Sequence, residues 1–186
     1  MPDYGGLPMN ARKHNATGFT LLEVLISIVI IAFGLLGIAG LQAFALKNNH
    51  SASLRLTATS LAADMVDRMK TNITAVGNGA YNAPTAAPYS PANKVAACLS
   101  TGCTSAQMAA HDLAEWGEKV ALTLPGGQAV VCLDSTPADG TAPGTAQCDG
   151  IGFVGYVIKI WWSDDRTTRS TVVNATRPLF WTAFNP

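Results

Sequence analysis

The sequence predicts an α+β fold, in which a long N-terminal helix packs on an antiparallel β-sheet and one further short helix follows. Three observations predict this fold. An apolar run from Val24 to Leu46 continues into a helical pattern that reaches Asn72, with no proline or glycine between Gly40 and Gly77. A stretch rich in proline and glycine, residues 77–93, then ends the helix. Short β-rich segments separated by turn residues fill the C-terminal third.

Length and composition limit what the chain can be. The 186 residues leave room for one modest globular domain beside the apolar run, which also raises the hydrophobic content to 48%. The formal net charge is zero and only 13% of the residues are charged. Because nucleic-acid-binding surfaces are strongly basic, no nucleic-acid partner is predicted.

The apolar run is long enough to cross a membrane. Val24 to Leu46 is 23 residues without a charge, and about 20 such residues span a bilayer as one helix. A polar leader, residues 1–18, precedes the run and carries Arg12, Lys13 and His14. Positive residues before a span and few after it place the leader in the cytoplasm and the remainder outside, with a membrane anchor between them.

The junction between the leader and the apolar run reads Gly18-Phe19-Thr20-Leu21-Leu22-Glu23. Together with the basic leader, this junction resembles the class III signal of type IV prepilins and pseudopilins, from Arg12 to about Leu46. The resemblance implies the type IV pilin fold. It also implies cleavage after Gly18 by prepilin peptidase and N-methylation of the new terminus, Phe19.

Glu23 is a carboxylate at the front edge of an apolar segment, where a lone charge is costly. After cleavage it would lie about one helical turn from the amine of Phe19 and close to the amine of a neighbouring subunit. We expect Glu23 to pair with such an ammonium and so to direct assembly in register. The alternative to this pairing is that the Glu23 side chain simply extends to the polar membrane interface, where water solvates its charge.

Two other interpretations of the N-terminal segment stay open. The first is an ordinary secretory signal peptide, for which Ala43-Phe44-Ala45 offers the A-x-A cleavage pattern. The second is a single-pass membrane anchor that is not cut, which would not require the Gly18–Phe19 junction. The apolar segment is longer than the 7–15 residues of a usual signal core, and Glu23 stands at its start. Both features favour the prepilin interpretation.

The second half of the long helix is amphipathic. Apolar residues recur at three- and four-residue steps, which predicts a stripe that packs on the sheet: Leu54, Ala58, Leu61, Met65, Met69 and Ile73. The sequence resembles PilV-like minor pilins in two segments: around Gly34, Gly37 and Gly40, and from Leu61 to Asn72. Major pilins usually have a proline near the middle of the apolar segment, and this chain has none. The predicted organisation is leader 1–18, apolar helix 19–46, amphipathic half 47–72 and globular head 73–186.

A second helix is expected from Ala106 to Leu124. Thr104 or Ser105 would cap its start, and Pro125-Gly126-Gly127 would stop it. Its buried stripe is predicted to hold Ala109, Leu113, Trp116, Val120 and Leu124. The neighbouring His111 and Asp112 are interpreted as a solvated pair, because no nucleophile motif accompanies them.

Four strands are predicted: Gln128–Asp134, Phe153–Ser163, Thr167–Ala175 and Leu179–Phe184. Hairpin-type connections between them predict an antiparallel sheet. Alternation in the second strand places one set of side chains on a common face, with Lys159 and Trp161 on the opposite face. That set is Val154, Tyr156, Ile158, Ile160 and Trp162.

The four cysteines all follow residue 97, in the part predicted to be exported. An even number in an oxidising compartment indicates two disulfides, and three connectivities are possible. We favour Cys98–Cys103, which closes a tight local turn, and Cys132–Cys148, which ties the first strand to the loop before the second. A zinc site is the competitor, although the spacings contain no CxxC pair.

The resemblance implies a minor pilin of a type IV pilus that helps prime the filament or sits at its tip, in twitching motility and attachment. Its partners would be other minor pilins, the major pilin, prepilin peptidase, the inner-membrane assembly platform and membrane lipid. No catalytic residue, metal or cofactor is predicted. The closest rival is a minor pseudopilin of type II secretion. A membrane-tethered enzyme and a binding module are more distant rivals; the binding module would use a basic edge of Lys159, Arg166, Arg169 and Arg177, interrupted by Asp164 and Asp165.

Overall fold

The structure is a computed structural model that describes residues 18–84, 94–142, 144–151, 155–163 and 179–186. The chain divides into two compact units, Met1–Leu46 and Lys47–Pro186, which we call the N-terminal and C-terminal units. The leader before Gly18, the predicted strand Thr167–Ala175 and most of the proposed basic edge (Arg166, Arg169, Arg177) lie outside the described residues.

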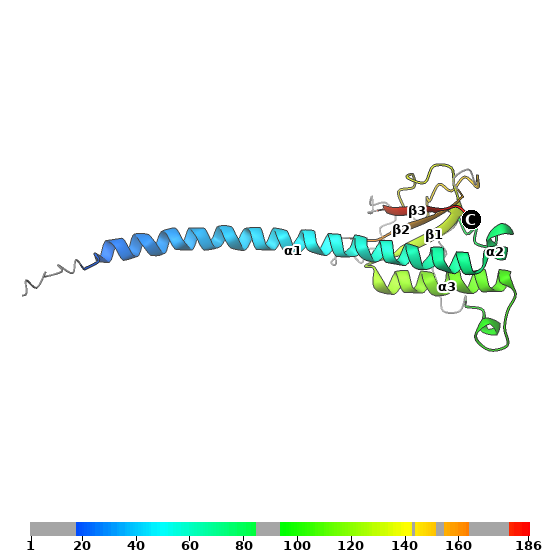
Figure 1. Cartoon of the computed structure of the whole chain (residues 1–186). Coiled ribbons are helices and arrows are strands. Elements are labelled where there is room, and N and C mark those ends of the chain that lie inside the picture. Colours follow the sequence, from blue (N-terminus) through cyan, green and yellow to red (C-terminus); the bar gives the residue numbers. More distant parts are fainter. Residues whose placement is uncertain (1–17, 85–93, 143, 152–154, 164–178) are drawn as a thin grey trace, which may run out of the picture. The chain divides into compact units, whose positions relative to one another are not determined.

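The long helix predicted from the apolar run is present as α1, Leu21–Thr71 (Figure 1). In the N-terminal unit, residues 21–46 carry no proline and one charge, Glu23, and all of them are exposed. In the C-terminal unit, α1 buries a stripe against the rest of the unit. That stripe comprises Leu54, Ala58, Leu61, Ala62, Met65 and Met69.

A second long helix, α3 (Ser105–Thr123), lies beside this part of α1 (Figure 1). Thr104 caps its start in a capping box, in which the Thr104 side chain accepts from Gln107 N–H and Gln107 returns a bond to the Thr104 backbone. The helix stops as predicted because the chain turns sharply at Gly127. A Cβ atom there would lie 2.4 Å from the Val120 carbonyl oxygen.

Two short elements were not predicted: α2 (Ile73–Gly77) and the 3₁₀ turn η2 (Ala96–Leu99). Each is five residues or fewer. Segments of that length are too short to show the periodicity that identifies a helix in sequence.

The sheet is antiparallel with strand order β1-β2-β3, which confirms the predicted α+β fold. Its strands are β1 (Gln128–Leu133), β2 (Tyr156–Trp161) and β3 (Leu179–Phe184). In the register, Val130 of β1 pairs with Lys159 of β2, which pairs in turn with Trp181 of β3. Glycine is required just before β2, because Gly155 has a φ of +90° and a Cβ atom would lie 2.5 Å from the Phe184 carbonyl oxygen.

One face of the sheet forms the main core with α1 and α3. Trp116 of α3 is fully buried there, and its indole N–H donates to the carbonyl of Leu61 at 2.7 Å. The sheet side chains in this core include Tyr156, Ile158 and Ile160, and Trp162 joins them. All four belong to the face predicted from alternation; the fifth member, Val154, lies outside the described residues.

The opposite face of the sheet carries a smaller core of Val130, Cys132, Ala146 and Trp161. Lys159 shares this face, as predicted, but its side chain is fully buried there. Disulfides join Cys98 to Cys103 and Cys132 to Cys148, which are the two pairs that the sequence favoured. The second disulfide ties β1 to the loop that covers this face.

Candidate processing and assembly site

The first turn of α1 is organised by a threonine cap. Glu23 N–H donates to the side-chain oxygen of Thr20 at 3.2 Å and to the Thr20 carbonyl at 3.1 Å. Thr20 is therefore the N-cap, and Glu23 is the third residue of the helix. This position places the carboxylate at the positive end of the helix dipole, which stabilises a negative charge.

The two residues of the proposed cleavage site lie just before this turn. Phe19 has 82% of its surface exposed. A Cβ atom added at Gly18 would meet no heavy atom within 4 Å. The bond between Gly18 and Phe19 is thus accessible within the described chain, and a larger side chain at position 18 would not disturb the fold.

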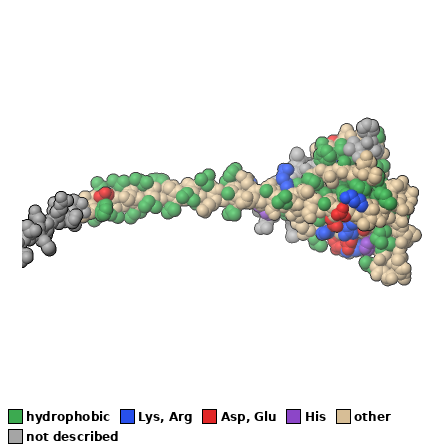
Figure 2. Space-filling model, viewed as in Figure 1, with side chains coloured by type: hydrophobic (Ala, Val, Ile, Leu, Met, Phe, Trp, Pro, Cys, Tyr) green, Lys and Arg blue, Asp and Glu red, His purple; other side chains and the backbone are tan. Residues whose placement is uncertain are grey.

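The surface of α1 behind this turn is apolar on all sides. Figure 2 shows hydrophobic side chains along the visible face of this segment. The helix contains an 18-residue stretch of mean hydropathy 2.8, long and apolar enough to cross a bilayer. None of that stretch is buried by the described chain. A helix that is hydrophobic all round and uncovered needs lipid or other protein chains around it.

The glycines of this segment leave space along the helix. A Cβ atom added at Gly34, Gly37 or Gly40 would meet nothing within 4 Å outside the helix's own backbone. Small residues of this kind let helices approach closely in an apolar environment. Their spacing by three places them on more than one side of the helix.

Two family models match the chain. The first, described as a prokaryotic N-terminal methylation motif, matches residues 13–39. The second, described as type IV pilin Tt1218, matches residues 40–114. The chain is a type IV pilin with a class III signal. Neither the curated proteins nor the solved structures contain a significant match.

The site residues can now be placed in this pilin. Gly18, Phe19 and Glu23 all fall within the matched methylation motif, at the start of α1. The apolar part of α1 and the motif together suit anchoring in the inner membrane and assembly into pili, with processing by prepilin peptidase. Membership of the pilin family implies a structural rather than an enzymatic role.

The C-terminal unit of the pilin holds a charged network between α1 and α3. Arg68 of α1 donates to Asp112 at 3.2 Å and to Glu115 at 2.6 Å, and Tyr81 donates to Asp112 at 2.6 Å. The hydrogen bond from Arg68 lowers the pKa of Glu115. Burial and the bond to Asp112 raise the pKa of Tyr81. Lys119 extends the network to Asp64 at 3.0 Å.

This network corrects one prediction. His111 and Asp112 were interpreted as a solvated pair, but only 6% and 7% of their surfaces are exposed. His111 Nδ1 accepts from the backbone N–H of Val95 at 3.2 Å, and Asp112 binds Arg68 and Tyr81. Both residues therefore hold neighbouring segments against α3. Sequence spacing could not show this, because Arg68 is 44 positions away from Asp112.

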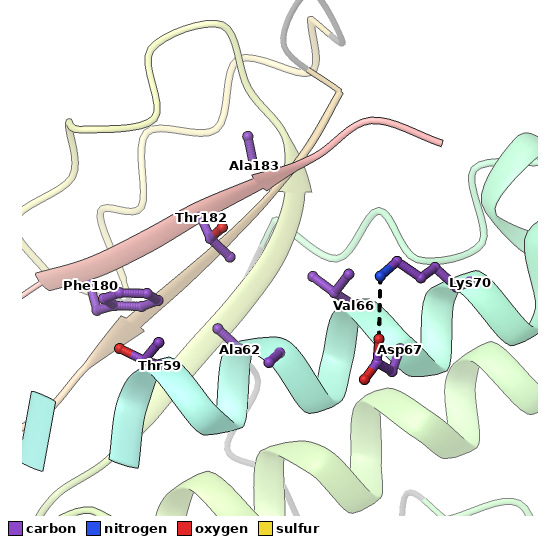
Figure 3. A pocket seen from close by; sticks show the side chains of 9 residues that line it. Thr59, Ala62, Val66, Asp67, Lys70, Phe180, Thr182 and Ala183 are labelled. Carbon is purple, nitrogen blue, oxygen red and sulfur yellow. Dashed lines mark hydrogen bonds and ion pairs between the residues drawn. The ribbon is translucent and has the colours of Figure 1, made fainter. Parts of the chain in front are cut away.

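A groove of about 270 Å³ lies between α1 and β3 in the C-terminal unit (Figure 3). Its α1 side includes Ala62 and Val66, and its β3 side includes Phe180 and Thr182. The charged residues in its lining, Asp67 and Lys70, bind each other at 3.3 Å. The lining is mostly small or apolar, which is a poor setting for acid–base chemistry.

The competing zinc interpretation can be compared with the geometry. Cys132, Asp134 and Cys148 bring one ligand atom each within 4.8 Å of one another. The two sulfurs are joined in a disulfide, and Asp134 lies against Lys159. Zinc binds thiolates, so this arrangement fits a disulfide and an ion pair rather than a metal.

Sequence reasoning missed Thr20. The signal was present, because Thr20-Leu21-Leu22-Glu23 has the Ser/Thr-x-x-Glu form of a capping box ahead of an apolar run. The structure shows the half of that box in which the Thr20 side chain accepts from Glu23 N–H.

Proposed function

We propose that this protein is a minor pilin of a type IV pilus, cut after Gly18 and methylated on Phe19. The observation that carries the proposal is the position of Glu23. It is the one charged residue in the stretch from Leu21 to Leu46, and it is fixed in the first helical turn next to the new terminus. An anchor that only held a domain in the membrane would need neither the charge nor its placement.

Assembly follows from the cost of an unpaired charge in lipid. A buried carboxylate without a partner costs several kcal/mol, and a cationic partner offsets much of this cost. In a bundle of pilins, Glu23 of an entering subunit would meet the terminal ammonium of a subunit already present. The pairing sets the register of the two helices and favours leaving the bilayer.

The proposed topology puts the leader 1–18 in the cytoplasm, the apolar helix 19–46 in the inner membrane, and residues 47–186 in the periplasm. Basic residues before the span support this orientation. The two disulfides of the C-terminal unit also support it, because disulfides persist in the oxidising periplasm.

The absence of proline from the middle of the apolar segment supports a minor rather than a major subunit, as in the PilV-like pilins. Its partners would be other minor pilins, the major pilin, prepilin peptidase, the assembly platform and membrane lipid. It would prime the filament or cap its tip, in twitching and adhesion. A minor pseudopilin of type II secretion is the alternative. Loss of twitching with secretion intact on deletion supports the pilus, and the reverse phenotype supports secretion.

The first test is the N-terminus of the protein extracted from its native membrane. We expect sequencing to begin at methylated Phe19. Gly18→Val should leave the leader attached, because the protease requires an unobstructed backbone at this position, while the tryptophan fluorescence of the C-terminal unit stays unchanged. A wild-type chain that keeps its first eighteen residues, or that begins after Ala45, contradicts the proposal.

The second test replaces the charge. Glu23→Gln keeps the shape of the side chain and removes its charge, so we expect normal membrane insertion and cleavage but at least a tenfold loss of the protein from sheared pilus fractions, the factor that corresponds to about 1.4 kcal/mol. Glu23→Asp is the matched control, since it keeps the charge on a shorter side chain and should retain part of the incorporation. Equal incorporation of the wild type and Glu23→Gln would rule out charge pairing as the driving force.

A further inference from the structure

A fully buried lysine lies on the sheet face that α1 and α3 do not cover. Lys159 stands in the middle of β2, between Val130 of β1 and Trp181 of β3, and its side chain is 0% exposed. Three residues that follow β1 contact its amine: Asp134, Asp139 and Ala146. Lysine is almost never fully buried unless it is paired, so the identity of its partners defines this site.

The amine of Lys159 is packed against a buried carboxyl group. Nζ lies 2.5 Å from Asp134 Oδ2, and the Asp134 side chain is also 0% exposed. Oδ2 nevertheless has no hydrogen-bond partner of normal geometry among the described residues. The nitrogen therefore contacts this carboxyl group closely without the alignment of a hydrogen bond. An amine and a carboxyl group meet here away from bulk water.

A second carboxylate and a hydroxyl complete the cluster. Asp139 Oδ1 accepts from Lys159 Nζ at 2.7 Å, and Asp139 Oδ2 accepts from the Thr136 hydroxyl at 2.6 Å. The backbone N–H of Thr136 donates to Asp134 Oδ1 at 3.0 Å, which polarises that carboxyl group. Asp139 is 34% exposed and so connects the buried pair to solvent.

We propose that Lys159 and Asp134 form an intramolecular isopeptide bond, with Asp139 relaying the protons. One proton passes from the Lys159 ammonium through Asp139 to Asp134. The neutral amine then attacks Cγ of Asp134, a bond forms between Nζ and Cγ, and a C–O bond of the carboxyl group breaks. A second nitrogen proton, relayed by Asp139, leaves with that oxygen as water. An ammonium and a carboxylate together have the composition of an amide plus water, so no oxidant or co-reactant is needed.

The environment favours the amide over the ion pair. Charges in an apolar interior lose their hydration, and a neutral amide removes that cost for both groups. The apolar neighbours on this face are Val130, Ala146 and Trp161. The amide nitrogen would keep one hydrogen, for which the Ala146 carbonyl, now 2.7 Å from Nζ, is an acceptor.

The same chain contains a matched pair that should not react. Lys119 binds Asp64 at 3.0 Å, but 54% and 30% of these side chains are exposed. Water solvates both charges there, which keeps the amine protonated. A cross-link confined to Lys159 and Asp134 would therefore identify burial as the cause.

The test is mass spectrometry of the protein extracted from its native membrane, denatured and reduced. We expect a mass one water molecule lower than that calculated for the chain from its observed N-terminal residue, including any N-methyl group, and a branched peptide that joins residue 134 to residue 159. The full mass of unlinked peptides overturns the proposal. The N-terminal residue can be read from the same sample independently, so failure of processing and failure of the cross-link are distinguishable.

One other reaction loses the same mass. Asp139 and Asp149 each precede a glycine, and such pairs can cyclise to succinimides. Mild alkali reopens a succinimide and restores the water but leaves an amide intact. A deficit that disappears in alkali, without a branched peptide, overturns the proposal.

Two variants assign the roles. Lys159→Arg keeps a buried cation but removes the nucleophile, so the mass deficit should vanish. Asp139→Asn keeps a hydrogen-bond acceptor beside Nζ but cannot relay protons, and we expect at least a tenfold loss of the branched peptide. A complete cross-link in Asp139→Asn would remove Asp139 from the mechanism. The wild-type spectrum decides the proposal even if neither variant folds.

Discussion

The two parts of α1 bury their apolar side chains in different ways. In residues 21–46 every residue is exposed, including large ones such as Leu36 at 70%. In residues 47–71 a stripe containing Leu61 and Met65 is buried by the rest of the C-terminal unit. Both parts are helical, which shows that forming the helix and burying its side chains are separate requirements. The first part must find its partner in lipid or in another subunit.

The sequence of each part matches the partner it requires. The exposed part is apolar all round and has one charge, Glu23. The packed part alternates its stripe with charged residues, among them Arg55, Asp67 and Lys70. A one-sided stripe serves a partner on one side, whereas an all-round apolar surface serves surroundings on every side.

The largest effect on stability is expected in the packed part of α1. It tests whether the two parts of the helix differ in how they bury their apolar side chains. Met65→Ala should lower the free energy of unfolding of the C-terminal unit by about 2–5 kcal/mol, because Met65 is fully buried and its loss leaves a cavity. Leu36→Ala should change it by less than about 0.5 kcal/mol, since the Leu36 side chain is 70% exposed.

Tryptophan fluorescence during denaturant unfolding measures both variants. All four tryptophans follow residue 115, so the signal reports on the C-terminal unit alone. Leu36→Ala should instead show its effect in incorporation into pili. An equal loss of unfolding free energy in both variants would mean that the apolar part packs on the C-terminal unit.

The elements of the C-terminal unit were largely predictable because local signals set them. Thr104 marked the start of α3, and the turn at Pro125 marked its end. Alternation placed Ile158 and Lys159 on opposite faces of β2. Such signals act within a few residues, which is the range over which a sequence can be interpreted without knowing the fold.

What covers each face was not predictable. Lys159 was placed on the correct face, but its burial depends on Asp134 and Asp139, 25 and 20 positions earlier. Asp112 was interpreted as solvated, although Arg68 and Tyr81 cover it. Periodicity identifies a face, while the partner of that face comes from tertiary packing.

A smaller effect concerns the caps of the two helices. Thr104→Ala should lower the free energy of unfolding of the C-terminal unit by about 1 kcal/mol, because Gln107 N–H loses its acceptor. Thr20→Ala should leave that free energy unchanged. It should instead speed hydrogen exchange at the amide of Glu23, which loses the Thr20 hydroxyl and keeps only the Thr20 carbonyl as an acceptor. Exchange unaffected by Thr20→Ala would show that this cap does not hold the first turn.

The smallest effect is the acid sensitivity of the network between α1 and α3. The hydrogen bond from Arg68 lowers the pKa of Glu115 in the folded protein below its ordinary value of 4.5. A lowered pKa adds stability above pH 4.5, and this stability is lost as the pH falls through the folded value. Because the Glu115 side chain is 46% exposed, solvent screening limits the effect to less than about 1 kcal/mol.

Glu115→Gln isolates this contribution. The variant cannot ionise, so its free energy of unfolding should fall below that of the wild type at pH 7, and the two values should converge as the pH drops well below 4.5. Other carboxylates with lowered pKa values, such as Asp149, remain in both proteins and cancel in the difference. A difference that persists at low pH would mean that Glu115 acts through packing rather than through its charge. Leu21–Leu46 has no such charged network, so the acid transition should be the same in Leu36→Ala as in the wild type.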